Sequence, residues 1–144
     1  MKSFRFPLER VLMWRRTQID LEEQRLKALA AEGQRIEREK AELEQSGAEA
    51  RQRVQGMKSA AGEDLNALAL FLGHVERAGR VLQNRREECR RRQAEQQRRF
   101  LEARRAYRVL ELLREKRFSE WEYEGNRELE AMVSETYLSQ WTQR

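Results

Sequence analysis

The 144-residue chain has little of what interrupts a helix or builds a reactive site: one proline, seven glycines, one cysteine and one histidine. The single Cys89 cannot form an internal disulfide, which is typical of a reducing compartment. No apolar run approaches the roughly 20 residues that cross a bilayer, and residues 1–7 lack the apolar core of a signal peptide. We therefore expect a cytosolic protein.

Patterns of catalytic and metal-binding residues are lacking as well. The sequence has no glycine-rich phosphate loop and no paired cysteines or histidines at metal-ligand spacing. Its acidic residues are mixed with basic ones at helical spacing, which is typical of the solvated face of a coiled coil. His74 is interpreted as a surface residue, and Cys89 as a small apolar residue in a helical seam. We expect no enzymatic activity, no catalytic residues, no metal and no cofactor.

Periodic apolar residues are what the sequence has instead. Hydrophobic residues make up 39% of the chain and charged residues 38%, a balance found in long helices and also in disordered chains. Because the apolar residues recur at helical spacing, we favour helices. The first seam consists of Leu12, Ile19, Leu26, Gly33, Lys40, Gly47, Val54 and Ala61, with companions Arg15, Glu22, Leu29, Ile36, Leu43, Ala50 and Met57. This seven-residue repeat predicts a coiled coil that Gly33, Lys40 and Gly47 weaken.

The stretch Ser59–Asp64 is where the helical pattern has reason to stop. Gly62 can take the positive φ that favours a helix C-terminus, and Asp64 can accept a hydrogen bond from the N–H groups of the following helix. The chain is therefore predicted to be all-α, a long two-helix antiparallel coiled-coil hairpin. We expect one domain over 1–144, with helix 1 at about 7–60, a turn at about 61–65 and helix 2 at about 66–138.

Charge supports this pairing of the two helices. The second seam continues through Leu68, Val75, Leu82 and Cys89, and then Phe100, Ala103, Tyr107 and Leu110. A turn centred near residue 63 places residue i opposite about residue 126 − i. Residues 20–49 then carry nine acids and five bases, net −4, and face residues 77–106 with eleven bases and four acids, net +7. Opposite charges favour the antiparallel register.

The same register leaves the residues beyond about 120 without a partner in the hairpin, so helix 2 is predicted to overhang. This overhang carries Trp121, Tyr123, Leu129, Met132, Val133, Tyr137, Leu138 and Trp141. So much apolar surface indicates contact with another molecule.

A basic run over residues 85–99 and a pI near 9.8 suggest nucleic-acid binding as one alternative. The facing acidic stretch neutralises part of this charge, and no aromatic residues are interleaved to stack on bases. We expect no nucleic-acid partner. A generic coiled-coil adaptor or homodimer is the second alternative, whereas the hairpin predicts a monomer.

Three stretches resemble one known family. Residues 4–12, FRFPLERVL, followed by Arg15, resemble the start of the bacterial flagellar export protein FliJ family. Residues 71–78, FLGHVERA, and the C-terminal stretches KRFSEW and ELEAM, which begin at Lys116 and Glu128, are also similar to the family.

The resemblance implies a non-enzymatic, cytosolic component of the flagellar type III protein export apparatus, which serves flagellum assembly and motility. In that family the hairpin is a stalk whose open end inserts in the hexameric export ATPase. Its turn end reaches the cytosolic domain of the export gate, at the cytoplasmic face of the inner membrane under the flagellar basal body. The family also escorts export chaperones. A related type III secretion system remains an alternative.

Two sets of contact residues follow from the apolar pattern and the resemblance. For the ATPase we expect the hydrophobic anchors Phe4, Phe6, Leu8, Trp14, Trp121, Leu129, Met132 and Tyr137. For the export gate we expect Phe71, Val75, Ala78 and Leu82, which lie on one helix face. Alternatively, Leu8, Trp14 and Trp121 pack on each other where the helices part, and Val75 and Leu82 pack in the seam.

Overall fold

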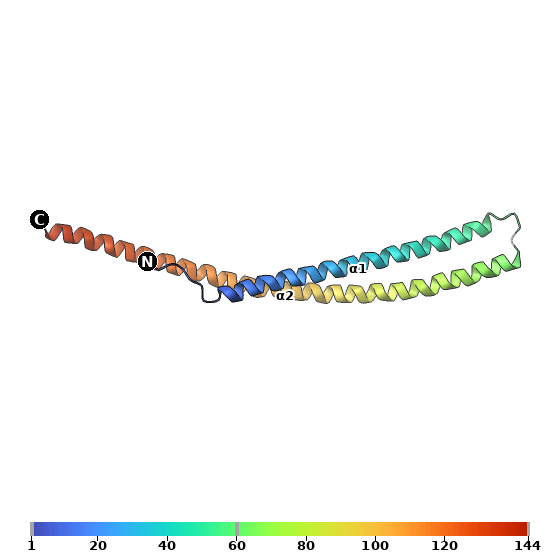
Figure 1. The fold of residues 1–144 in the computed structure, drawn as a ribbon, viewed down its shortest axis with the longest axis horizontal. Helices are drawn as coiled ribbons and strands as arrows, with labels where there is room; N and C mark the ends of the chain where they lie inside the picture. Colours follow the sequence, from blue (N-terminus) through green and yellow to red (C-terminus); the bar gives the residue numbers. More distant parts are fainter. Residues whose placement is uncertain (1, 60, 144) are drawn as a thin grey trace. The chain divides into compact units, whose positions relative to one another are not determined.

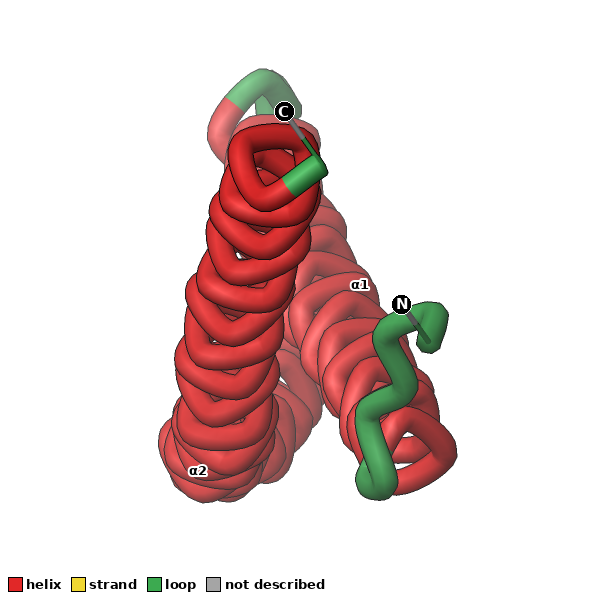
Figure 2. Tube along the Cα trace, turned by 90° about the vertical axis from the view of Figure 1, so that its left-hand side faces the viewer, coloured by secondary structure: helices red, strands yellow, loops and turns green. Residues whose placement is uncertain are grey.

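The computed structural model describes residues 2–59 and 61–143, which form two long helices, α1 (Glu9–Gln55) and α2 (Gly62–Thr142) (Figure 1). Loops occur at the N-terminal segment and between the helices (Figure 2), and no strand occurs in the described ranges. Neither helix, over the same ranges, has a stretch long and apolar enough to span a membrane. The helices pack antiparallel, so the predicted all-α hairpin is confirmed.

Contacts divide the chain into two compact units, which we name the terminal unit and the turn unit. The terminal unit comprises Met1–Leu21 and Leu101–Arg144, and the turn unit comprises Glu22–Phe100. Each unit contains part of α1 and part of α2.

The connection between the helices lies earlier in the chain than predicted. α1 ends at Gln55, where the Gly56 N–H donates to the Gln52 carbonyl at 2.9 Å. The described residues 56–59 and 61 belong to the connection that was predicted at about 61–65, and Ala60 lies outside the described residues. Gly62 is the first residue of α2, and no described glycine has a positive φ, so the predicted C-terminal cap at Gly62 is wrong. The chain instead leaves α1 at Gly56.

Asp64 caps the start of α2, but the N–H group that donates to it is not one of those predicted. Asp64 Oδ2 accepts a hydrogen bond from the N–H of Ala61, the residue before the helix, at 3.3 Å. A carboxylate three residues into the helix that reaches back in this way forms half of a capping box. α2 therefore begins at Gly62, four residues earlier than predicted.

The helix register also differs from the prediction. In the turn unit, Cys89 contacts Leu29, Arg86 pairs with Glu37, and Val75 lies against Gly47. In these three pairs and in the Arg92–Glu32 pair, the two residue numbers add up to between 118 and 124. The prediction gave a sum of about 126. The shift follows from the earlier end of α1, which moves the centre of the turn towards the N-terminus.

The predicted seam of α1 is the face that packs on α2. Every seam position from Leu12 to Val54 is buried or half-buried, while Met57 and Ala61, beyond the end of α1, are exposed. Ile36, Leu82 and Cys89 form the core of the turn unit, with Leu43 packed against them. Cys89 is fully buried and its Sγ donates to the Leu29 carbonyl at 3.5 Å, which confirms its assignment to the seam.

The two seam glycines are sites of close approach. A β-carbon at residue 33 would overlap Arg86 Nη1, and one at residue 47 would lie 3.4 Å from Val75 Cγ1. The absence of side chains at Gly33 and Gly47 therefore makes room for residues of α2.

Polar groups join the two helices within the turn unit. Arg86 and Arg92 pair with Glu37 and Glu32 at 2.9 and 2.8 Å. The buried Gln96 donates from Nε2 to the main-chain carbonyl of Glu22 at 3.1 Å and also to the Glu22 carboxylate. Specific polar pairs thus accompany the opposite net charges, although most of the ion pairs among the described residues lie within one helix.

Candidate docking surface at the end of α2

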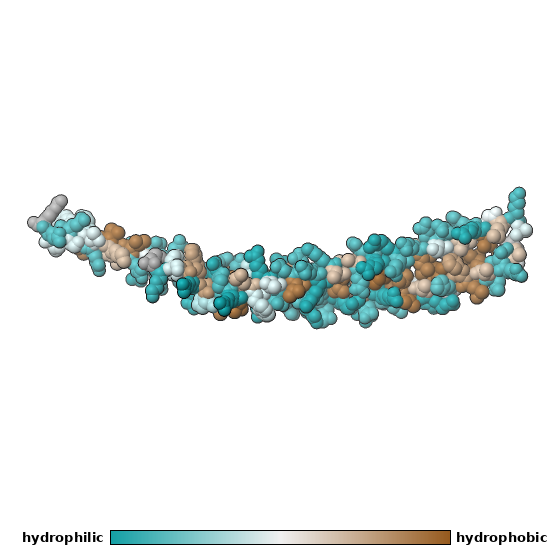
Figure 3. Space-filling view, in the orientation of Figure 1, coloured by the Kyte–Doolittle hydropathy of each residue, from teal (hydrophilic) through white to brown (hydrophobic). Residues whose placement is uncertain are grey.

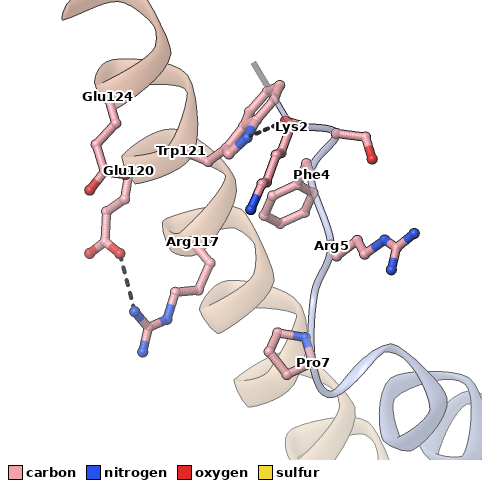
Figure 4. A pocket seen from close by; sticks show the side chains of 9 residues that line it. Lys2, Phe4, Arg5, Pro7, Arg117, Glu120, Trp121 and Glu124 are labelled. Atoms are coloured by element: carbon pink, nitrogen blue, oxygen red, sulfur yellow. Dashed lines mark hydrogen bonds and ion pairs between the residues drawn. The ribbon is translucent and has the colours of Figure 1, made fainter. Parts of the chain in front are cut away.

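The N-terminal segment Lys2–Phe6 lies on α2 and is called here the N-terminal clasp (Figure 4). The Phe4 ring packs edge-on against Phe118, with ring centroids 5.2 Å apart, and lies 5.8 Å from the Trp121 ring. Trp121 Nε1 donates to the Lys2 carbonyl at 3.1 Å. The rings and this hydrogen bond together hold a non-helical segment against two turns of helix.

Arg114 connects the clasp to the beginning of α1. Its Nε lies 2.9 Å from Glu9 Oε2, and its guanidinium carbon lies 5.6 Å from the centroid of the Phe4 ring. A guanidinium at that distance from an aromatic ring gives a cation–π attraction. Phe6, 8% exposed, is buried in the same unit.

The clasp corrects the predicted start of the overhang. Trp121 is half-buried rather than unpartnered, and Gly125, one turn further on, is buried. The prediction ended the pairing at about residue 120, but Lys2 and Phe4, which precede α1, contact α2 at Trp121 and Phe118. The unpartnered segment begins after Gly125, since every described residue from 126 to 143 is exposed.

We call residues 122–143 the C-terminal arm. Its large apolar side chains are between 54% and 70% exposed: Tyr123, Leu129, Met132, Val133, Tyr137, Leu138 and Trp141. Leu129, Met132, Val133 and Tyr137, at spacings of three, one and four, lie on one side of the helix. The Tyr137 and Trp141 rings, 6.2 Å apart, extend this surface towards the end of α2. Apolar surface is visible along this part of the helix in Figure 3.

The predicted ATPase anchors fall into three groups. Phe4 and Phe6 belong to the clasp, and Trp121 lies half-buried against it. Leu129, Met132 and Tyr137 are exposed on the arm. Leu8 and Trp14 are exposed, and the Arg15 guanidinium lies 4.9 Å from the Trp14 ring. Trp121 packs on Phe4 and Phe118, so the aromatic contacts differ from the alternative in which it packs on Leu8 and Trp14.

The predicted gate residues lie in the turn unit and are mostly part of the seam. Leu82 is 8% exposed within the core, and Val75 is half-buried beside Gly47. Leu82 therefore packs in the seam against α1, as in the alternative given for it, and its contact with the export gate stays a prediction. Ala78 is half-buried, and Phe71, 37% exposed, is the member of this set that lies most open to a partner.

Sequence reasoning missed Phe118 and Arg114 as the residues of α2 that the clasp contacts. Phe118 stands three residues before Trp121, a spacing that places both rings on one helix face. That spacing was a usable signal, but the position of Phe4 beside them depends on a non-helical segment whose path has no periodicity.

His74 is exposed, and no three His, Cys, Asp or Glu side chains in the described part of the chain are placed to hold a metal ion.

The fold and the surface define a two-helix hairpin with an aromatic clasp and an apolar arm that is exposed over residues 126–143. Compared with the models of known protein families, the curated proteins and the solved structures, the chain gives no match.

Proposed function

We propose that this chain is a FliJ-like stalk of a bacterial type III export apparatus, whose C-terminal arm and clasp insert in a hexameric export ATPase. The observation that carries the proposal is the arm, whose side chains Leu129, Met132 and Val133 are 54%, 59% and 67% exposed. Full burial of each such side chain contributes about 1.5–3 kcal/mol, so a ring lumen that covers them gains substantial affinity.

The clasp adds a second argument for this end of the hairpin. Residues 4–12 carry the resemblance to the family, and Phe4 and Glu9 within them fix the N-terminal segment to α2 through Phe118 and Arg114. The segment that resembles the family thus lies beside the exposed apolar surface of the arm. The assignment rests on the resemblance and this geometry, since the comparisons supply no relative.

The remaining parts of the proposal rest on the resemblance alone. The turn end, through Phe71, contacts the cytosolic domain of the export gate, and the stalk assists the delivery of export chaperones. Hydrolysis belongs to the ATPase, and the stalk is a non-enzymatic, cytoplasmic protein at the inner face of the membrane.

Binding to the purified hexameric ATPase tests the proposal. In the full chain, L129A/M132A/V133A removes three exposed apolar side chains from the arm, and we expect about 100-fold weaker binding, as for three moderate hot spots. The matched control L65A/L70A/V81A removes three side chains, 52%, 68% and 52% exposed, from the turn unit. It should leave ATPase binding unchanged. Equal affinities for both variants and the unchanged chain would contradict the proposal.

A second measurement separates the gate contact from the ATPase contact. Phe71→Ala should weaken binding to the purified cytosolic domain of the gate and leave ATPase binding intact. Leu70→Ala, which removes a neighbouring side chain that is 68% exposed, is the control. Loss of gate binding in both variants would point to a general apolar attraction at the turn end.

A further inference from the structure

The C-terminal arm is acidic, although the chain is basic. Residues 122–143 contain five acids and the single base Arg127, net −4, whereas the whole chain carries +5. Within the described part of the chain, these five glutamates form no ion pair. The acids are Glu122, Glu124, Glu128, Glu130 and Glu135.

Three of these acids follow one edge of the apolar face. Glu124, Glu128 and Glu135 are separated by four and seven residues, which places them in one line along a helix. Met132 is four residues after Glu128 and three before Glu135, so it lies next to both. A surface that covers Met132 therefore also meets these carboxylates.

In the turn unit, acidic residues of one helix form ion pairs with arginines of the other. There the acidic stretch of α1 meets the basic stretch of α2, and Glu32 and Glu37 each reach an arginine at 2.8 to 2.9 Å. Among the described residues the arm faces no basic stretch: Lys2 of the clasp lines a hollow with Glu124 and Glu128 but forms no ion pair with them. A second arm, with the same excess of acids, would bring like charges together and is disfavoured as the partner.

We infer that the arm is received by an apolar groove whose border carries arginine or lysine side chains facing Glu124, Glu128 and Glu135. This inference rests on the proposed function and specifies the chemistry of the ATPase surface that binds the stalk. Apolar contact supplies most of the affinity, while the opposite charges orient the arm and speed its entry.

Association kinetics with the hexameric ATPase test the inference at about 50 and 300 mM salt, where screening of exposed charges differs strongly. For E124Q/E128Q/E135Q we expect an association rate about tenfold lower at low salt and a weaker salt dependence. The matched control E39Q/E42Q/E44Q neutralises three acids of α1 in the turn unit and should behave as the unchanged chain. Circular dichroism verifies that both variants remain helical.

The possible outcomes separate the two proposals. Binding of the unchanged chain with no effect of E124Q/E128Q/E135Q on rate or salt dependence would overturn the cationic groove and leave the stalk proposal standing. Failure of the unchanged chain to bind the ATPase at either salt would overturn the proposed function and the inference with it. Concentration-dependent dimerisation that L129A/M132A/V133A abolishes would identify a second copy as the occupant and also overturn the inference.

Discussion

The Arg86 side chain crosses α1 at Gly33, where a β-carbon would overlap Nη1 and stand 3.2 Å from Cζ. Arg86 Nε lies 2.9 Å from Glu37 Oε1, but the geometry gives an ion pair without a directed hydrogen bond. The guanidinium is thus held by charge and by the space that glycine leaves. A glycine that the heptad pattern marks as a defect is therefore a packing position.

Substitution of Gly33 should separate packing from helix propensity. Alanine in a helix interior is favoured over glycine by about 1 kcal/mol, and Gly79→Ala, with no atom within 4 Å of the added β-carbon, should gain that amount. Gly33→Ala must displace Arg86, so we expect its free energy of unfolding to fall about 1–3 kcal/mol below that of G79A. Urea unfolding followed by circular dichroism measures both. Equal gains would show that Arg86 moves aside at no cost.

Leucines of α2 should differ sharply with burial. Leu82→Ala removes a side chain that is 8% exposed and packed with Ile36, and we expect a loss of about 2–5 kcal/mol. Leu70→Ala, 68% exposed in the same helix, should change stability by less than about 0.5 kcal/mol. Thermal or urea unfolding compares the two. A small effect of Leu82→Ala would argue against this seam and favour the contact of Leu82 with the export gate.

The thiol of Cys89 should be protected by the fold. Because the side chain is fully buried, labelling by a thiol reagent in native buffer requires opening of the turn unit. We expect the reaction to be at least about 100-fold slower than in denaturant. Ala48→Cys in a Cys89→Ala background provides an exposed thiol on α1 as the control. Equal rates for the two thiols would contradict the packing of Cys89.

The clasp should report through the fluorescence of Trp121. In a W14F/W141F background Trp121 is the sole tryptophan, and Phe4→Ala removes the ring beside it. We expect a red shift of emission and stronger quenching by acrylamide, with little loss of global stability, because the clasp lies outside the helical seam. Phe71→Ala, in the turn unit, should leave the emission unchanged. An unaltered spectrum in F4A would show that the clasp does not cover Trp121 in solution.

The seam was predictable because, in a pair of helices, the buried face depends mainly on the spacing of apolar residues along each helix. Leu12, Ile36 and Cys89 could be placed in it from spacing alone, since residues three or four apart share one side of a helix. The apolar arm was predictable for the same reason, once helix 2 was seen to be the longer. The net negative charge of the arm, in a chain that is net positive, also follows from the sequence.

The sequence by itself determined the two helices, their antiparallel direction and the face on which they meet, because periodicity and net charge act through neighbours along the chain. Tertiary structure decided the register, the contact of Arg86 with Gly33 and the packing of Phe4 on Trp121. These contacts depend on where α1 ends and on the path of a non-helical segment. Neither is set by a repeat, because each results from packing between residues far apart in the chain.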